Sequence, residues 1–96
     1  MQAVARLNPL RLFGERLRSL RVERGYSQEK LAELSGLHRN YVGDVERGIR
    51  NVGLLNILHL AHALDVLPAE LLGPFTGAEM KRLPSRAELP ARRDEK

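Results

Sequence analysis

Apolar residues recur at intervals of three and four along the first quarter of the chain, as they do on one face of an α-helix. The stripe comprises Leu10, Phe13, Leu17 and Leu20. Asn8 and Pro9 suit the N-cap and the first helical residue, and Gly25 suits the end of a helix. The pattern therefore predicts a helix from residue 9 to about residue 24, which packs through this stripe.

Residues 27–48 predict two short helices joined by a tight turn. The hydroxyl of Ser27 can cap the first helix, and the residues that follow are good helix formers. Gly36 suits a left-handed turn, and Gly48 suits the end of the second helix, which we expect over residues 38–47. Five apolar residues are expected to meet in the angle between the helices: Leu31, Leu34, Leu37, Val42 and Val45. This arrangement is typical of a helix-turn-helix.

The stretch from residue 54 to residue 72 is too apolar for one buried face. We predict a helix over 54–64, with no strong side-chain cap at its start, and a short helix over 68–72. A helix that is apolar on several sides is buried on several sides, and a two-fold partner is the simplest way to bury it. The expected dimer interface comprises Leu58, His62, Val66, Leu67, Leu71 and Leu72. The alternative is a monomer with scattered exposed leucines, which surfaces tolerate.

Three segments are expected along the chain: a flexible arm at 1–8, one domain at 9–72 and a disordered, charged tail at 73–96. Proline and glycine interrupt the tail, and charges of both signs dominate its end. The string GAEMKRL within it suits one further turn of helix.

The net charge of +4 is unevenly distributed. Residues 1–25 hold six Arg against two Glu, whereas residues 51–72 contain no Lys or Arg. The basic end suits phosphates, and the apolar, slightly acidic end suits a protein partner. No signal peptide is visible, and no apolar run approaches the roughly 18 residues of a membrane span. We therefore expect a cytoplasmic protein without a membrane partner.

The residues that the chain lacks argue against several kinds of site. Without cysteine, neither a disulfide nor a thiolate metal site can form. His59 and His62 have the spacing of two metal ligands on a helix, but no third ligand completes a site, so we expect no metal. No nucleophile–base pair and no phosphate-binding glycine loop is recognisable. We expect neither an enzyme nor a cofactor nor a small-molecule ligand.

One group of residues agrees in type and spacing with a known family: Arg21, Gly25, Ser27-Gln28-Glu29, Leu31-Ala32, Gly36, Glu46, Gly48 and Asn51. Over about residues 10–72 the sequence resembles the Cro/CI-type, or Xre, helix-turn-helix proteins. The string LHRNYVGDVERGIRN is further similar to the controller proteins of restriction–modification systems. The resemblance implies an all-α fold, a compact five-helix, lambda repressor-like DNA-binding domain. It also implies an ion pair between Arg21 and Glu46, which ties the first helix to the third.

The third helix would be the recognition helix, and five of its residues are expected to contact bases. Arg39 can donate two hydrogen bonds to guanine, and Asn40 has an amide suited to adenine or to a phosphate. Tyr41 can contact a thymine methyl or a phosphate. Gly43 removes a side chain and lets the backbone approach the DNA. Asp44 can accept from cytosine N4, although we favour a pair with a nearby arginine.

Six further residues are expected to contact phosphates: Ser27, Gln28, His38, Arg47, Arg50 and Asn51. Contacts of this kind fix the register of a protein on DNA without reading its sequence. In the family the glutamine that matches Gln28 contacts a phosphate, and a helix N-terminus suits an anion. Arg47, Arg50 and Asn51 belong to the loop after the recognition helix, beside the groove.

Two functions fit these expectations. The first is a homodimeric, sequence-specific transcription regulator of the repressor or controller type, which binds a pseudo-palindromic operator in double-stranded DNA. The second is the antitoxin of a toxin–antitoxin module, which binds its own promoter and masks a toxin with its tail. RNA polymerase is a further possible partner. A protein that keeps the fold but has lost DNA binding is disfavoured by the arginines at 39, 47 and 50.

Overall fold

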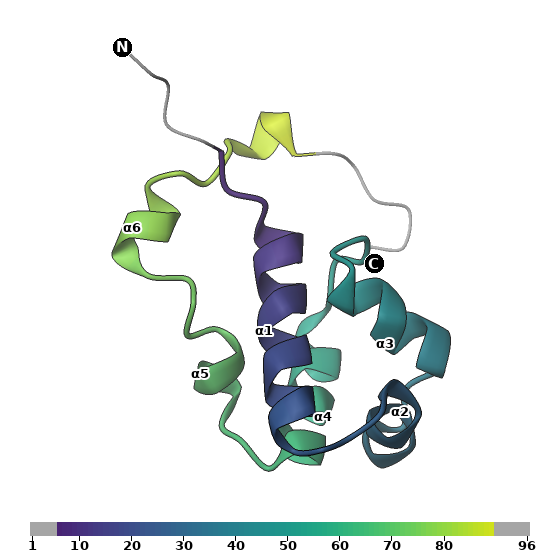
Figure 1. The fold of residues 1–96 in the computed structure, drawn as a ribbon. Coiled ribbons are helices and arrows are strands. Elements are labelled where there is room, and N and C mark those ends of the chain that lie inside the picture. Colours follow the sequence, from purple (N-terminus) through teal and green to yellow (C-terminus); the bar gives the residue numbers. More distant parts are fainter. Residues whose placement is uncertain (1–5, 90–96) are drawn as a thin grey trace.

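The computed structural model describes residues 6–89, and this part of the chain is all-α, without a strand. Its elements are α1 (Pro9–Glu23), α2 (Gln28–Ser35), α3 (Arg39–Glu46), α4 (Leu54–Leu64), α5 (Pro68–Leu71), α6 (Gly77–Met80) and the 3₁₀ helix η1 (Arg86–Glu88). The first five helices are the ones that the sequence predicts, so the all-α, five-helix prediction is confirmed. Two short helical turns follow them in the C-terminal extension (Figure 1).

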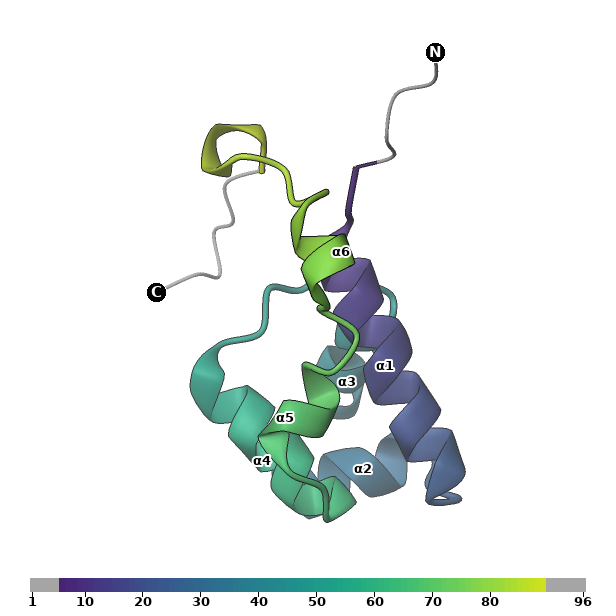
Figure 2. The same ribbon diagram turned by 90° about the vertical axis from the view of Figure 1, so that its left-hand side faces the viewer.

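The helices surround one apolar core. Helix α1 contacts α3 on one side and α5 on the other, while α4 contacts α2 and α5 (Figures 1 and 2). The core residues come from all five helices: Phe13, Leu17, Leu20, Leu31, Ala32, Val42, Val45, Leu60, Ala61, Leu64 and Leu71. Since α2 and α3 lie together at one side of α1, the helix-turn-helix unit is mounted on the N-terminal helix (Figure 1).

The helix boundaries follow the local chemistry of the sequence. The side chain of Asn8 accepts from the Arg11 N–H at the start of α1, and the Ser27 hydroxyl accepts from the Lys30 N–H at the start of α2. Gly36 ends α2 in the left-handed conformation, with φ of 78°. Helix α4 begins after Gly53 without a side-chain cap, as predicted. The predicted caps and stops are therefore present where helix boundaries require them.

Two glycines let α1 approach the end of α3 closely. A Cβ at Gly14 would lie 2.3 Å from the carbonyl oxygen of Val45 and 2.6 Å from that of Glu46. Gly48, just after α3, has φ of 78°, and a Cβ there would lie 2.7 Å from the Cα of Arg11. These distances are shorter than non-bonded contact allows, so the two helices meet backbone to backbone.

Two apolar residues differ from the expectation. Leu34 was expected in the angle between α2 and α3, but it is 42% exposed because its position on α2 faces away from the core. Leu71 was expected at a dimer interface, but it is fully buried within the protomer, since α5 packs against α1 and α4. Leu71 is therefore removed from the set of residues that a partner can reach.

The C-terminal extension differs in part from the expected disordered tail. Residues 73–89 include α6, the predicted extra turn of helix, and η1. The N–H of Leu7 donates to the carbonyl of Arg82 at 2.9 Å, and Arg6 pairs with Glu88 at 2.8 Å. Leu7 itself is buried, so the end of the expected N-terminal arm packs rather than extends into solvent. Residues 1–5 and 90–96, which complete the expected arm and tail, lie outside the described part.

Among the helices of residues 6–89, none combines the length and the apolar character needed to cross a membrane.

The contact between α1 and α3 predicts a large effect of one methyl group. Gly14→Ala places a Cβ against two backbone carbonyls that cannot rotate away, so we expect the free energy of unfolding to fall by about 2 kcal/mol or more. Gly77→Ala is the control, because no atom lies within 4 Å of a Cβ there. Urea unfolding at one protomer concentration compares the variants. Equal stability of Gly14→Ala and wild type would contradict the close approach.

Candidate DNA interface

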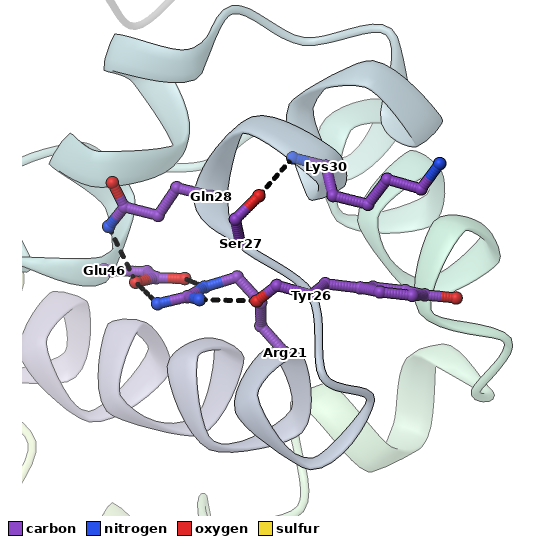
Figure 3. A network of polar contacts seen from close by, with 6 residues as sticks. All are labelled: Arg21, Tyr26, Ser27, Gln28, Lys30 and Glu46. Carbon is purple, nitrogen blue, oxygen red and sulfur yellow. Dashed lines mark hydrogen bonds and ion pairs between the residues drawn. The ribbon is translucent and has the colours of Figure 1, made fainter.

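A buried carboxylate joins the helix-turn-helix to the first helix. The side chain of Glu46, at the end of α3, is 3% exposed. Its Oε2 accepts from Arg21 Nε at 2.6 Å, and its Oε1 accepts from Arg21 Nη2 at 3.0 Å, so the pair is bidentate (Figure 3). Arg21 Nη1 also donates to the carbonyl of Tyr26 at 2.7 Å. The ion pair that the resemblance implies is thus present, and it also holds the loop between α1 and α2.

Gln28 brings the second helix into the same network. Its Nε2 donates to Glu46 Oε1 at 3.0 Å, so a single carboxylate holds side chains from α1 and α2 (Figure 3). Gln28 is half-buried at the crossing of α2 and α3, while Ser27 caps α2 from the exposed side. The network restrains the angle between α2 and α3, and this angle sets the orientation of α3 on the surface of the domain.

The N-terminal end of α3 is open to solvent. Arg39 and Asn40 are both exposed, and His38 caps the helix by accepting the Asn40 N–H on Nδ1 at 3.1 Å. A neutral imidazole that accepts on Nδ1 carries its proton on Nε2, which is left as a donor. The Nε of Arg39 lies 4.0 Å from Glu29 Oε2 on α2, in a well-exposed pair. Such pairs are weak, so the Arg39 guanidinium is available to another anion or acceptor.

The other end of α3 carries a charge cluster of Asp44, Arg47 and Arg50. Asp44 Oδ1 accepts from Arg47 Nη2, and Asp44 Oδ2 lies 3.6 Å from Arg50 Nε. The guanidinium of Arg50 lies over the ring of Tyr41, 5.4 Å from its centroid. Asp44 therefore pairs with nearby arginines, as we favoured, and does not project alone toward a base. Asn51 lies half-buried on the loop that follows.

The structure corrects the role expected for Gly43. This residue is buried, and a Cβ there would lie 3.4 Å from Gln28 Oε1 and 3.5 Å from Arg47 Nη1. Gly43 therefore faces the α2–α3 crossing beneath two side chains, where its backbone is not offered to a base.

Tyr41, which was expected to contact a base, has contacts within the protein. Its ring is half-buried against the core, and its hydroxyl accepts from Asn56 Nδ2 on α4 at 3.1 Å. Sequence reasoning missed Asn56, although a single amide within the apolar string LLNILHLAHAL was a signal that could have identified it. It also missed Glu29 as an ion-pair partner of Arg39. His59 and His62 are exposed on α4, and residues 6–89 contain no group of three His, Asp or Glu side chains placed to hold a metal.

Neutralising the Glu46 carboxylate is expected to lower the stability of the fold. Glu46→Gln leaves the Arg21 guanidinium in a nearly buried site without a counter-charge, so we expect the free energy of unfolding to fall by about 3 kcal/mol. Glu33→Gln removes the same charge from an exposed pair with Lys30 and should change stability by less than about 0.5 kcal/mol. Thermal and urea unfolding measure both. Similar losses of unfolding free energy for the two variants would show that the Glu46 network stabilises the fold no more than an exposed ion pair does.

Comparison with known proteins agrees with this geometry. A family model described as helix-turn-helix matches residues 17–71, more than half of the chain. The control protein C.BamHI of Bacillus amyloliquefaciens is 50% identical over 62 residues, which cover 64% of this chain and 76% of the relative. The control protein C.SmaI of Serratia marcescens is 49% identical over 61 residues, which cover 64% and 73%.

Solved structures show the same similarity. The restriction–modification controller protein C.AhdI from Aeromonas hydrophila superimposes with a TM-score of 0.66 and 63% identity, over 68% of this chain and 98% of that chain. The family model spans the second half of α1 through the end of α5, and so includes the exposed N-terminus of α3 and the buried Arg21–Glu46 pair. The chain therefore belongs to the helix-turn-helix family of DNA-binding regulators, which is not a family of enzymes.

Proposed function

We propose that this protein is a homodimeric, sequence-specific transcription regulator of the restriction–modification controller type. The observation that carries the proposal is the exposed N-terminal end of α3, where Arg39 and Asn40 project from a helix whose other end is held by the Glu46 network. The similarity to control proteins supports the controller type. We place its action in the cytoplasm.

The chemistry of α3 suits insertion into the major groove. The N-terminal residues of a recognition helix approach base edges, and an arginine there can donate two bonds to guanine O6 and N7. Asn40 has both a donor and an acceptor, which match the exposed edge of adenine. His38 offers Nε2–H beside them, and Arg47 and Arg50 lie at the opposite end of the helix, where they suit the DNA backbone. Arg39 and Asn40 would thus read the bases of one half-site. The remaining side chains would contact the DNA backbone at both ends of α3.

The dimer rests on the outer face of α4 and the segment that follows it. Leu55, Leu58 and His62 share the face of α4 that the protomer leaves open, and Leu67 nearby is 70% exposed. We propose that these residues and Leu72, which is 46% exposed, make up one mainly apolar surface on a stretch that holds no Lys or Arg. A second copy covers such a surface isologously and places two α3 helices about one helical turn, roughly 34 Å, apart.

Selection from randomised DNA on the purified chain tests the function as a whole. The proposal expects an enriched inverted repeat whose half-site centres lie about 10 base pairs apart. Salt-sensitive binding without an enriched sequence would overturn the assignment as a specific regulator.

Arg39 is expected to read one base pair. Arg39→Ala should reduce discrimination at a single guanine-containing position of each half-site by about 1–3 kcal/mol, because it removes two directed hydrogen bonds. Competition binding with the selected site and its single-base variants measures this. Equal weakening on selected and random DNA would contradict a reading role.

Arg50 provides the matched comparison on the same helix-turn-helix. Arg50→Ala should weaken binding to selected and to random DNA without changing the preference at any single base position, and it should lower the slope of log affinity against log salt by about 1, as expected for one lost phosphate contact. Titration across salt concentrations on selected and random DNA measures both. A lost preference at one base position would instead make Arg50 a reader.

The dimer surface predicts a difference between two equally exposed leucines. Leu58 is 40% exposed and Leu34 is 42% exposed, but only Leu58 lies on the proposed interface. Leu58→Glu should shift the protein to monomer at micromolar concentration, because it buries two carboxylates across the two-fold axis. Leu34→Glu should leave the assembly unchanged. Sedimentation velocity over a concentration series distinguishes these outcomes, and dimerisation of Leu58→Glu would refute the proposed face.

A further inference from the structure

An acidic residue lies between the two arginines that are best placed to hold the DNA backbone. Asp44 accepts from Arg47 through Oδ1, and its Oδ2 lies 3.6 Å from Arg50 Nε. The Asp44 side chain is 24% exposed, whereas that of Arg47 is 64% exposed. The carboxylate is therefore the inner partner of the cluster, and the guanidiniums form its outer surface.

Other contacts restrict where these arginines can lie. Arg47 reaches back along α3 over Gly43, where a Cβ would be in ordinary contact with its Nη1, at 3.5 Å. Arg50 lies over the Tyr41 ring, which Asn56 in turn holds through the tyrosine hydroxyl. Each guanidinium is thus supported on one side by the protein and bound to Asp44 as well. Because a guanidinium has five donor hydrogens, each arginine can keep its ion pair with Asp44 and still donate to a phosphate.

We propose that Asp44 is a positioning residue that raises sequence discrimination by restraining Arg47 and Arg50 and by neutralising part of their charge. The proposal deepens the proposed function and rests on it. Affinity for random DNA depends mainly on the number of phosphates that Lys and Arg side chains neutralise. A fixed carboxylate between two arginines therefore lowers this affinity. Binding to the selected site depends also on placing each donor at a defined phosphate, which the restrained geometry favours.

Removing the Asp44 carboxylate is expected to raise affinity for random DNA more than affinity for the selected site. With Asp44 present, the cluster offers a net charge of +1, given by two arginines and one carboxylate. Removing the carboxylate raises it to +2, which strengthens attraction to any phosphate backbone. The same change frees the arginines to adopt several positions, which costs affinity only where a single position is required. Discrimination should therefore fall while affinity for random DNA rises.

Asp44→Asn tests the proposal on the 96-residue chain, with the selected site and a random duplex titrated across salt. We expect affinity for the random duplex to rise about eightfold at 0.1 M salt, the effect of one additional neutralised phosphate, with a salt slope steeper by about 0.9. Affinity for the selected site should change less than about threefold, since lost positioning offsets the added charge. Asp44→Glu, which keeps the charge, should retain low affinity for the random duplex.

Two controls follow. The first separates this role from a general effect of net charge, and the second asks whether it acts through Arg47 and Arg50. Glu33→Gln removes the same charge from α2, where the partner is Lys30, and should leave the ratio of specific to random affinity unchanged. In an Arg47→Ala/Arg50→Ala background, Asp44→Asn should no longer alter that ratio. An unchanged slope on random DNA, or an equal gain on both duplexes, would overturn the role of Asp44 while the regulator assignment stands. A wild-type protein that selects no sequence would overturn both.

Discussion

The Glu46 carboxylate lies inside the domain, where an ionised group without partners would cost several kcal/mol. Its two oxygens accept from Arg21 and Gln28, so the cost is offset only when α1, α2 and α3 have their observed relative positions. Hydrophobic burial alone tolerates small rotations of packed helices, whereas a bidentate ion pair does not. The orientation of the helix-turn-helix therefore depends on one buried charge, which the backbone contact at Gly14 reinforces.

This constraint divides α3 into two ends with different properties. The C-terminal end is fixed by Glu46 and by close contact with α1, and it carries a charge cluster centred on Asp44. The N-terminal end is only capped, by His38, and exposes Arg39 and Asn40. The reading role that we propose for α3 benefits from this division, because the Glu46 network holds the helix while Arg39 and Asn40 stay exposed.

The sequence predicts the fold well because helix boundaries and the core depend on local patterns. Ser27 and Gly36 act within a few residues of their own position, and the apolar stripes have helical spacing. The errors concern contacts between segments far apart in the chain. The burial of Gly43 depends on where Gln28 lies, and that of Leu71 depends on how α5 meets α1 and α4. The resemblance anticipates the Arg21–Glu46 pair. The sequence marks Asn56 as a lone amide in an apolar string, but it does not indicate that this amide donates to Tyr41 on another helix.

We propose that the N-terminal end of α3 reads bases in the major groove. Methylation interference at guanine N7 and adenine N3 of the selected DNA site examines this, with wild type and Arg39→Ala compared. We predict that methylation of one guanine in each half-site blocks the wild-type protein, because N7 is an acceptor for Arg39, and that the variant is indifferent to the same methylation. Interference confined to adenine N3 in the minor groove, or a pattern identical in the two proteins, would show that Arg39 does not read the major groove.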